Sequence, residues 1–141
     1  MATTNTTLYN SGQKAARRAG GQPVTIYAEV ALAAAGLNDT VNMFKIPSGA
    51  RVVDWSIGSD DIDSNGTPTV TLSLGDSGSA TRYVSASTIG QTGAAPIDAK
   101  VKTGYGFLYS ADDTCIITVS AAAATFAAGS VRCHLTYTFD N

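Results

Sequence analysis

The sequence has few of the histidine and cysteine residues that bind zinc and no segment that would cross a membrane. It contains one histidine and two cysteines in 141 residues, which provides neither a C-x-x-C pair nor an H-E-x-x-H zinc motif. No apolar run approaches the ~20 residues that span a bilayer, and the start of the chain does not show the pattern of a secretory signal. We therefore expect a protein that is made in a cytoplasm, with no membrane association and no cofactor.

Charged residues are also scarce, at 14% of the chain against roughly 25% in typical soluble domains. A surface with so little charge suits packing against another protein. The net charge of −2 and the pI near 5.1 argue against a nucleic-acid partner, because nucleic-acid-binding domains are normally basic. The charges are unevenly distributed, since the first 28 residues carry three basic residues and no acidic residue.

The three basic residues lie in a segment whose composition differs from the rest of the chain. Residues 1–23 are mostly Thr, Asn, Gly, Ser and Ala, and they cannot bury enough apolar surface to offset their chain entropy alone. We predict an extended N-terminal arm over residues 1–23 and a single β-sandwich domain over residues 24–141. Two interpretations of the arm stay open: it docks on a partner, or it is a disordered tail that keeps the protein soluble. If the arm docks, an apolar anchor beside basic groups would make the contact. The candidate contact residues are therefore Leu8, Tyr9, Lys14, Arg17 and Arg18.

The remainder of the chain has the pattern of a β protein. Short runs of β-branched and aromatic residues alternate with turn-forming residues, and no convincing amphipathic helix interrupts them. The alanine-rich stretch 121–128 is interpreted as a loop or a short strand. We predict an all-β fold, an antiparallel β-sandwich or jelly roll, with Trp55 at the centre of its core. The expected strands cover residues 24–33, 37–46 with a bulge, 50–58, 69–74, 81–88, 105–110, 114–120 and 131–140.

The two cysteines lie in apolar runs near the end of the chain. Cys115 and Cys133 share the phase of the neighbouring aliphatic residues, so both side chains should point into the core. Free buried thiols are favoured over a disulfide, because a reducing compartment keeps thiols reduced.

Residues 75–78 spell G-D-S-G, the tetrapeptide found around the nucleophile of chymotrypsin-like proteases. A serine nucleophile needs a histidine base and a carboxylate that orients it. His134 is the only histidine, it follows Ser77 in the chain, and its strand phase places it toward solvent or a partner. The tetrapeptide is therefore interpreted as a hairpin turn, and we expect no enzymatic activity.

Residues 61–66 match the D-x-D-x-N-G opening of a calcium loop, with Asp61, Asp63 and Asn65 at the ligand positions and Asp60 beside them. An EF-hand also needs a bidentate Glu at the twelfth loop position, which is Leu72 here, and two flanking helices. Two interpretations stay open: a calcium site of another type within a β loop, and a solvated turn.

Three stretches of the sequence can be compared with known protein families: residues 28–35, 37–54 (LNDTVNMFKIPSGARVVD) and 72–84 (LSLGDSGSATRYV). In these stretches the chain resembles the capsid cement, or decoration, proteins of tailed bacteriophages, which are small virion structural proteins of the jelly-roll type. The resemblance implies a non-enzymatic β-sandwich on the outside of an icosahedral capsid, often a dimer or trimer at local symmetry axes. The arm would lie across neighbouring subunits of the major capsid protein and staple them.

The alternative function is a carbohydrate- or receptor-binding sandwich of a phage fibre or head fibre. Such a role requires exposed aromatic residues in a groove. Only 8% of the residues are aromatic, and most of them share strand phase with aliphatic residues, which favours the capsid role.

Overall fold

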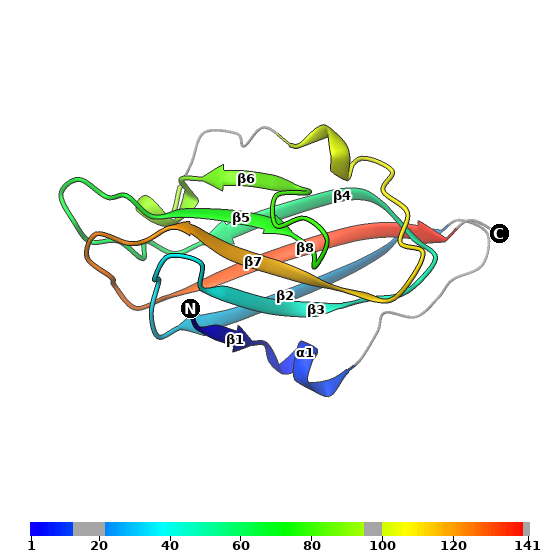
Figure 1. The fold of residues 1–141 in the computed structure, drawn as a ribbon, viewed down its shortest axis with the longest axis horizontal. Helices are drawn as coiled ribbons and strands as arrows, with labels where there is room; N and C mark the ends of the chain where they lie inside the picture. Colours follow the sequence, from blue (N-terminus) through cyan, green and yellow to red (C-terminus); the bar gives the residue numbers. More distant parts are fainter. Residues whose placement is uncertain (13–21, 95–99, 140–141) are drawn as a thin grey trace.

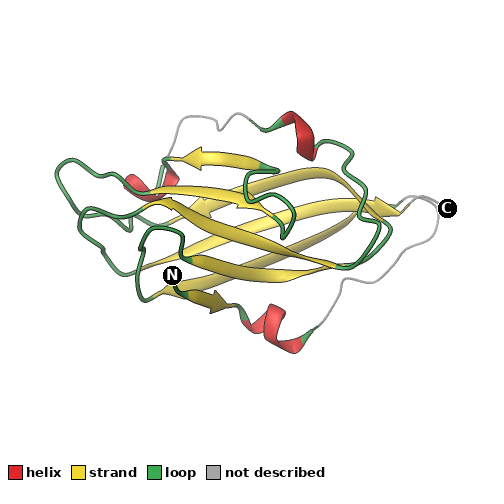
Figure 2. Ribbon diagram, in the orientation of Figure 1, coloured by secondary structure: helices red, strands yellow, loops and turns green. Residues whose placement is uncertain are grey.

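The chain folds into two β-sheets that pack face to face (Figures 1 and 2), as the all-β prediction requires. The computed structural model describes residues 1–12, 22–94 and 100–139. Its strands are β1 (Thr3–Asn5), β2 (Val24–Leu32), β3 (Thr40–Ile46), β4 (Ala50–Ser59), β5 (Thr71–Gly75), β6 (Val84–Ser87), β7 (Asp113–Ala121) and β8 (Gly129–Phe139). One sheet has the strand order β1-β3-β7-β5-β6 and the other β2-β8-β4. All the pairings are antiparallel except that of β1 with β3.

The described helices are short and lie outside the two sheets. They are the α-helix α1 (Thr7–Ser11) and the 3₁₀ turns η1 (Ile89–Gln91) and η2 (Lys102–Gly104). None of these helices has the length and apolar character that crossing a membrane would require.

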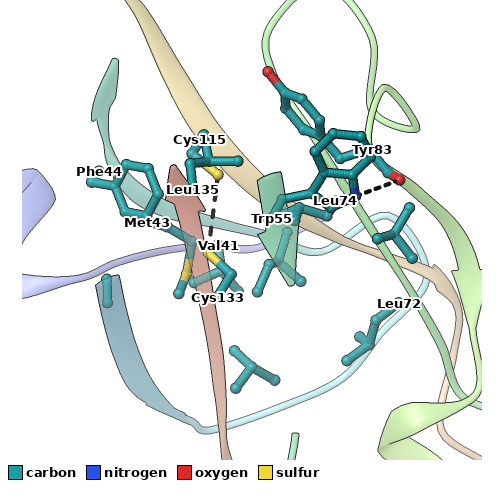
Figure 3. Close-up of a cluster of buried hydrophobic side chains, with 14 of the residues drawn as sticks. Val41, Met43, Phe44, Trp55, Leu72, Leu74, Tyr83, Cys115, Cys133 and Leu135 are labelled. Carbon is teal, nitrogen blue, oxygen red and sulfur yellow. Dashed lines mark hydrogen bonds between the residues drawn. The ribbon is translucent and has the colours of Figure 1, made fainter. Parts of the chain in front are cut away.

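The core lies between the sheets and is built from alternate residues of their strands (Figure 3). In β7 and β8 every second side chain is buried, because successive side chains of a strand point to opposite faces. Trp55 is 1% exposed, and its Nε1 donates a hydrogen bond to the Tyr83 carbonyl oxygen at 3.0 Å. Its predicted place in the core is confirmed, as is the inward orientation of Cys115 and Cys133, which are both free thiols.

In β3 and β4, a β-bulge sets which residues face the core. The expected bulge in β3 lies between Asn42 and Phe44, and it allows the adjacent residues Met43 and Phe44 both to be buried. A second bulge, in β4 between Val52 and Asp54, was not expected. An extra residue changes the phase of a strand, so Val52 and Trp55 are both buried although three positions separate them.

Residues 105–110 were predicted as a strand, and this prediction is wrong. The segment instead follows the edge of β4 with irregular pairing, in which the Gly106 N–H donates to the Val52 carbonyl at 2.8 Å and the Tyr109 N–H to the Ala50 carbonyl at 2.9 Å. Gly106 has a φ of 70°, which an extended strand cannot contain. The segment therefore covers one edge of the three-stranded sheet without joining it as a regular strand.

The other predicted strands are present with shifted ends. The observed strands exclude the predicted residues 33, 37–39, 69–70, 81–83 and 88, whereas β7 extends to Ala121. The rest of the alanine-rich stretch is a loop with one isolated bridge, from Phe126 to Asp63, so the loop interpretation was the better of the two. Residue 140 lies outside the described ranges.

Candidate functional site

The first 12 residues lie against the body, which differs from the extended arm expected over residues 1–23. Strand β1 pairs with β3 along the edge of the five-stranded sheet. The Ala2 N–H donates to Asp39 Oδ1 at 2.7 Å, and Asn42 Nδ2 donates to Asn5 Oδ1 at 2.9 Å. The prediction of an extended arm considered only the apolar surface that these residues could bury. An edge strand instead gains order from backbone hydrogen bonds to its neighbour, and a polar sequence can do this.

Two of the five candidate contact residues, Leu8 and Tyr9, lie on α1. Thr6 caps this helix: its Oγ1 accepts the Tyr9 N–H at 3.0 Å and donates to the Met43 carbonyl. Leu8 is half-buried against the core. The Tyr9 ring lies 4.2 Å from Lys45 Nζ, a cation–π contact. Both side chains therefore hold the N-terminal segment on the body of its own chain.

The other three candidate residues follow the end of this helix. Helix α1 ends at Ser11 and is capped by Gly12, whose φ of 66° is the left-handed conformation that often terminates helices. Lys14, Arg17 and Arg18 lie outside the described residues.

An open groove of about 370 Å³ lies beside the end of α1, with two carboxylates in its wall. Asp113 Oδ1 accepts the backbone N–H groups of Ser77 at 3.3 Å and Thr114 at 2.7 Å. Asp112 Oδ1 accepts the Ser48 N–H at 2.9 Å. The residues that line the groove are Gly12, Lys45, Ser77, Asp112, Asp113 and Thr114. The wall next to Gly12, the last described residue before the three basic residues of the sequence, thus carries two carboxylates and one ammonium group, that of Lys45.

The outer face of the five-stranded sheet is a nearly uncharged surface of mostly polar residues, many of them Thr and Ser. In its five strands the only charged residues are Lys45 and Asp113. In one row across β1, β3 and β7, Thr3 pairs with Thr40 and Thr40 with Thr118, and the first two hydroxyls are 3.1 Å apart. Short side chains lose little conformational entropy when they are covered. This face therefore suits burial against another protein.

The outer face of the three-stranded sheet is charged. Arg132 Nη2 lies 2.8 Å from Asp60 Oδ1 and 3.3 Å from Glu29 Oε1. Asp54 forms an ion pair with Lys100. All these side chains are about one-third to one-half exposed, and covering them would require the removal of their hydration. The contrast between the two faces was missed in the sequence, because strand alternation shows which residues face outward but not which strands share a sheet.

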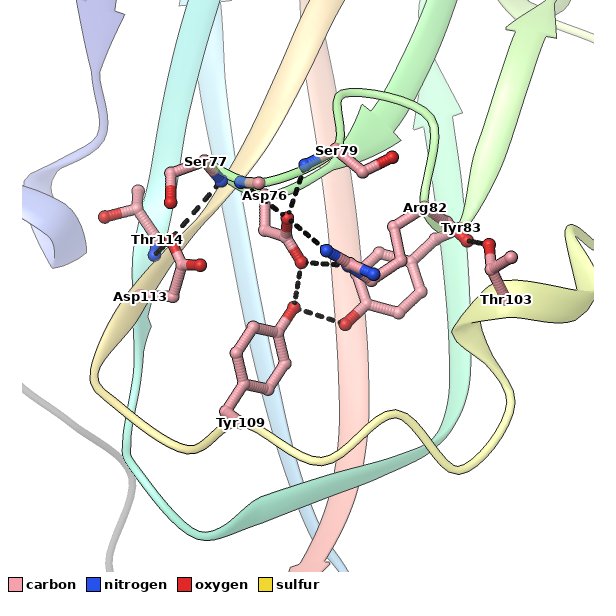
Figure 4. Close-up of polar contacts among 10 residues, drawn as sticks. Asp76, Ser77, Ser79, Arg82, Tyr83, Thr103, Tyr109, Asp113 and Thr114 are labelled. Atoms are coloured by element: carbon pink, nitrogen blue, oxygen red, sulfur yellow. Dashed lines mark hydrogen bonds and ion pairs between the residues drawn. The ribbon is translucent and has the colours of Figure 1, made fainter.

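The G-D-S-G stretch forms a turn, as interpreted from the sequence, and Asp76 is its central residue (Figure 4). Its carboxylate accepts the Ser79 N–H at 2.8 Å and the Tyr109 hydroxyl at 2.7 Å, and it forms an ion pair with Arg82. Burial opposes ionisation of this carboxyl. The hydrogen bonds from Arg82, Tyr109 and the Ser79 N–H nevertheless hold its pKa below the ordinary value. Asp76 thus joins the turn to the segment that contains Tyr109.

A Ser-His-Asp grouping does occur in the structure, but it does not include Ser77. His134 Nδ1 lies 2.7 Å from Ser56 Oγ, and its Nε2 lies 3.8 Å from Asp54 Oδ2. The group lies on the open, charged sheet face, where Asp54 is 53% exposed and paired with Lys100. A catalytic triad depends on a buried carboxylate that orients the histidine, so this group does not provide that chemistry.

The loop that matched a calcium motif is organised around one buried carboxylate. Asp63 is 1% exposed, which corrects the interpretation as a solvated turn. Its oxygens accept backbone N–H groups at 2.8–3.2 Å from Thr69, Val70, Ala124 and Thr125. Burial alone would raise the pKa of Asp63, but these four donors lower it far below its ordinary value. Asp63 thereby ties two loops together.

The other two carboxylates of the calcium motif have partners of their own. Asp60 pairs with Arg132, and Asp61 Oδ1 accepts the Asp63 N–H at 3.1 Å. The acidic, histidine and cysteine side chains in the described ranges form no group of three that could hold a metal ion.

Comparison with known proteins places this architecture among phage capsids. No protein-family model matches the chain, and no curated protein sequence does. A chain in the capsid asymmetric unit of cyanophage Pam1 is 38% identical, with a TM-score of 0.77 over 91% of this chain and 92% of that chain. A chain in the capsid of Ralstonia phage GP4 is 19% identical, with a TM-score of 0.85 over 99% of both chains. A chain in the acidic stable capsid of Helicobacter pylori bacteriophage KHP30 is 16% identical, with a TM-score of 0.51 over 86% of this chain and 95% of that chain. The last two likenesses show the fold alone, whereas the first extends to the sequence.

Proposed function

Because the chain belongs to a family of phage capsid proteins, we propose that it is a cement protein. It binds the outside of an icosahedral capsid and staples neighbouring subunits of the major capsid protein. The observation that carries this proposal is the unequal charge of the two sheet faces. The five-stranded face, which is nearly uncharged, lies on the capsid, and the charged three-stranded face is turned to solvent.

The binding surface in this proposal combines that face with the N-terminal segment. Strand β1 is the edge strand of the same sheet, so the segment begins beside the face and extends it. Leu8 and Tyr9 fix α1 on the body and offer the capsid their exposed portions. Lys14, Arg17 and Arg18 then contact acidic groups of the shell. Self-association as a dimer or trimer is part of the proposal, since linked copies bind a shell more tightly than single copies do.

In the part of the chain that the structure describes, no specific contact favours the carbohydrate- or receptor-binding alternative. Among the described residues, the well-exposed aromatic side chains are Tyr27 and Tyr105. Tyr27 lies on β2, whereas Tyr105 lies beyond β4, the opposite edge strand of the three-stranded sheet. They therefore do not form a shared aromatic groove.

Introducing a charge on the five-stranded face tests the proposed orientation. Thr118→Glu is expected to weaken binding to capsids that lack this protein by at least about tenfold, because an unpaired carboxylate would be buried in the contact. Thr136→Glu is the matched control, since Thr136 occupies a similar half-buried outer position on β8, in the other sheet. Binding is measured by co-sedimentation with the capsids, after thermal melting has shown that both variants are folded. Equal binding of the two variants would refute the proposed orientation.

Replacing Lys14, Arg17 and Arg18 by Ala tests the basic segment. Attachment is expected to weaken several-fold at low salt, and its salt dependence should become shallower, because screened charge pairs are lost. Substitution is preferable to deletion of residues 1–23, which would also remove β1 from the sheet edge.

A charge-matched variant provides the control for the basic segment. Replacing Lys100, Lys102 and Arg132 by Ala removes the same net charge from outside the proposed contact. If this variant loses the same affinity, net charge and not the segment determines attachment. If attachment of the first variant is unchanged across the salt series, the contact is apolar.

A further inference from the structure

The two thiols of the chain face each other across the core (Figure 3). Cys115 lies on β7, the middle strand of the five-stranded sheet, and Cys133 on β8, the middle strand of the other sheet. Their Sγ atoms are 4.0 Å apart, and the two residues are 0% and 2% exposed. Because the sequence contains only these two cysteines, this pair is the place where a disulfide could join the central strands of the two sheets.

We propose that Cys115 and Cys133 are a latent inter-sheet crosslink, which a small-molecule disulfide such as oxidised glutathione converts into a protein disulfide. One cysteine thiolate attacks the small disulfide, forms a mixed disulfide and releases one small thiol. The second cysteine thiolate then attacks the protein sulfur of the mixed disulfide and releases the other small thiol. Two protein thiols are oxidised and one small disulfide is reduced to two thiols, so atoms and electrons balance.

Disulfide formation requires the two sulfur atoms to move closer together. Their separation must fall from 4.0 Å to about 2.05 Å, a decrease to which rotations of both side chains contribute. Both strands are hydrogen-bonded to a neighbour on each side, so their backbones are held in place. β-Sandwiches of the immunoglobulin type contain an inter-sheet disulfide beside a buried tryptophan. Here Trp55 pairs in register with Leu135, two residues beyond Cys133.

Burial determines when the crosslink forms. The thiolate is the reacting species, and burial together with the neighbouring Cys133 raises the pKa of the Cys115 thiol well above its ordinary value. The folded protein therefore reacts slowly, and oxidation takes place while the sandwich is open, during folding or a transient separation of the sheets. This inference stands independently of the capsid-binding role.

The test is refolding in a glutathione redox buffer. The full chain is unfolded in guanidinium chloride, refolded with oxidised and reduced glutathione, quenched with acid and analysed by mass spectrometry and thiol titration. The expected product is a monomer that has lost two hydrogen atoms and has no free thiol. Its melting temperature should exceed that of the reduced protein by roughly 10 °C, because the crosslink restricts the unfolded chain.

Two controls separate this disulfide from other effects of the oxidant. Cys115→Ala and Cys133→Ala, treated in the same way, should show no such mass loss and no gain in melting temperature. The inference is overturned if the refolded wild-type protein keeps both thiols free, or if it yields only glutathione adducts or crosslinked dimers. It is also overturned if the oxidised monomer melts at or below the temperature of the reduced protein.

Discussion

Replacing Asp76 by Asn is expected to lower the free energy of unfolding by about 3 kcal/mol, because the change leaves a largely buried cation without its partner. The Asp76 side chain is 0% exposed and that of Arg82 is 15% exposed. The guanidinium of Arg82 also lies 3.6 Å from the centre of the Phe107 ring, so it cannot turn to solvent without the loss of that contact. Urea denaturation at pH 7 measures the effect.

The effect of this substitution should depend on pH. The pKa of Asp76 is lowered in the folded protein, so its contribution is present above the unfolded pKa of about 3.9 and is lost as the pH falls through the folded pKa. The difference between wild type and variant should therefore narrow below about pH 4.

A surface ion pair provides the matched control for Asp76. Asp54→Asn also removes a carboxylate that pairs with a cation, but Asp54 and Lys100 are 53% and 33% exposed. Such pairs contribute at most about 1 kcal/mol, so this variant should remain close to wild type. If the two variants are equally stable, the Asp76 network does not hold the turn as the structure indicates.

Replacing Gly75 by Ala is expected to cost about 3 kcal/mol, since the new methyl group would overlap the backbone. A Cβ atom at Gly75 would collide with the Ser79 carbonyl oxygen and lie 2.6 Å from the Ala80 carbonyl oxygen. Both obstacles are main-chain atoms, and the Asp76 N–H donates to the same Ser79 oxygen at 3.0 Å. The turn must therefore open to admit the methyl group.

The control for Gly75 is Gly66→Ala, because a Cβ at Gly66 would meet nothing within 4 Å. That change should alter the free energy of unfolding by no more than about 0.5 kcal/mol. Guanidinium denaturation of the two variants and wild type provides the comparison. A Gly75→Ala protein as stable as Gly66→Ala would show that the turn adapts without cost.

Most of the body was predictable from local patterns. Alternation with a period of two identified the principal strands, and the adjacent apolar residues Met43 and Phe44 were consistent with a bulge. The same reasoning failed for residues 105–110. Their apolar and aromatic residues fit a strand, but the positive φ of Gly106 depends on how the segment turns around the edge of β4.

The candidate site was less predictable, because its properties depend on pairing across long sequence distances. Composition identified an unusual N-terminal segment and its basic residues. It did not indicate that Asn5 would pair with Asn42, since the β1–β3 pairing joins residues 37 positions apart. Asp63 shows the same limit: its motif suggested a solvated turn or a cation site, whereas N–H groups from residues 124 and 125 occupy its oxygens.

The sequence by itself determined the β class of the fold, the inward orientation of Trp55 and both cysteines, and the scarcity of charge, because each follows from local periodicity or composition. Only the tertiary structure decided which strands share a sheet. It thereby collected the charged residues on one outer face and left the other nearly neutral. It also placed the two cysteine sulfur atoms 4.0 Å apart on the central strands of opposite sheets. These outcomes depend on contacts between residues distant in sequence, which local periodicity does not encode.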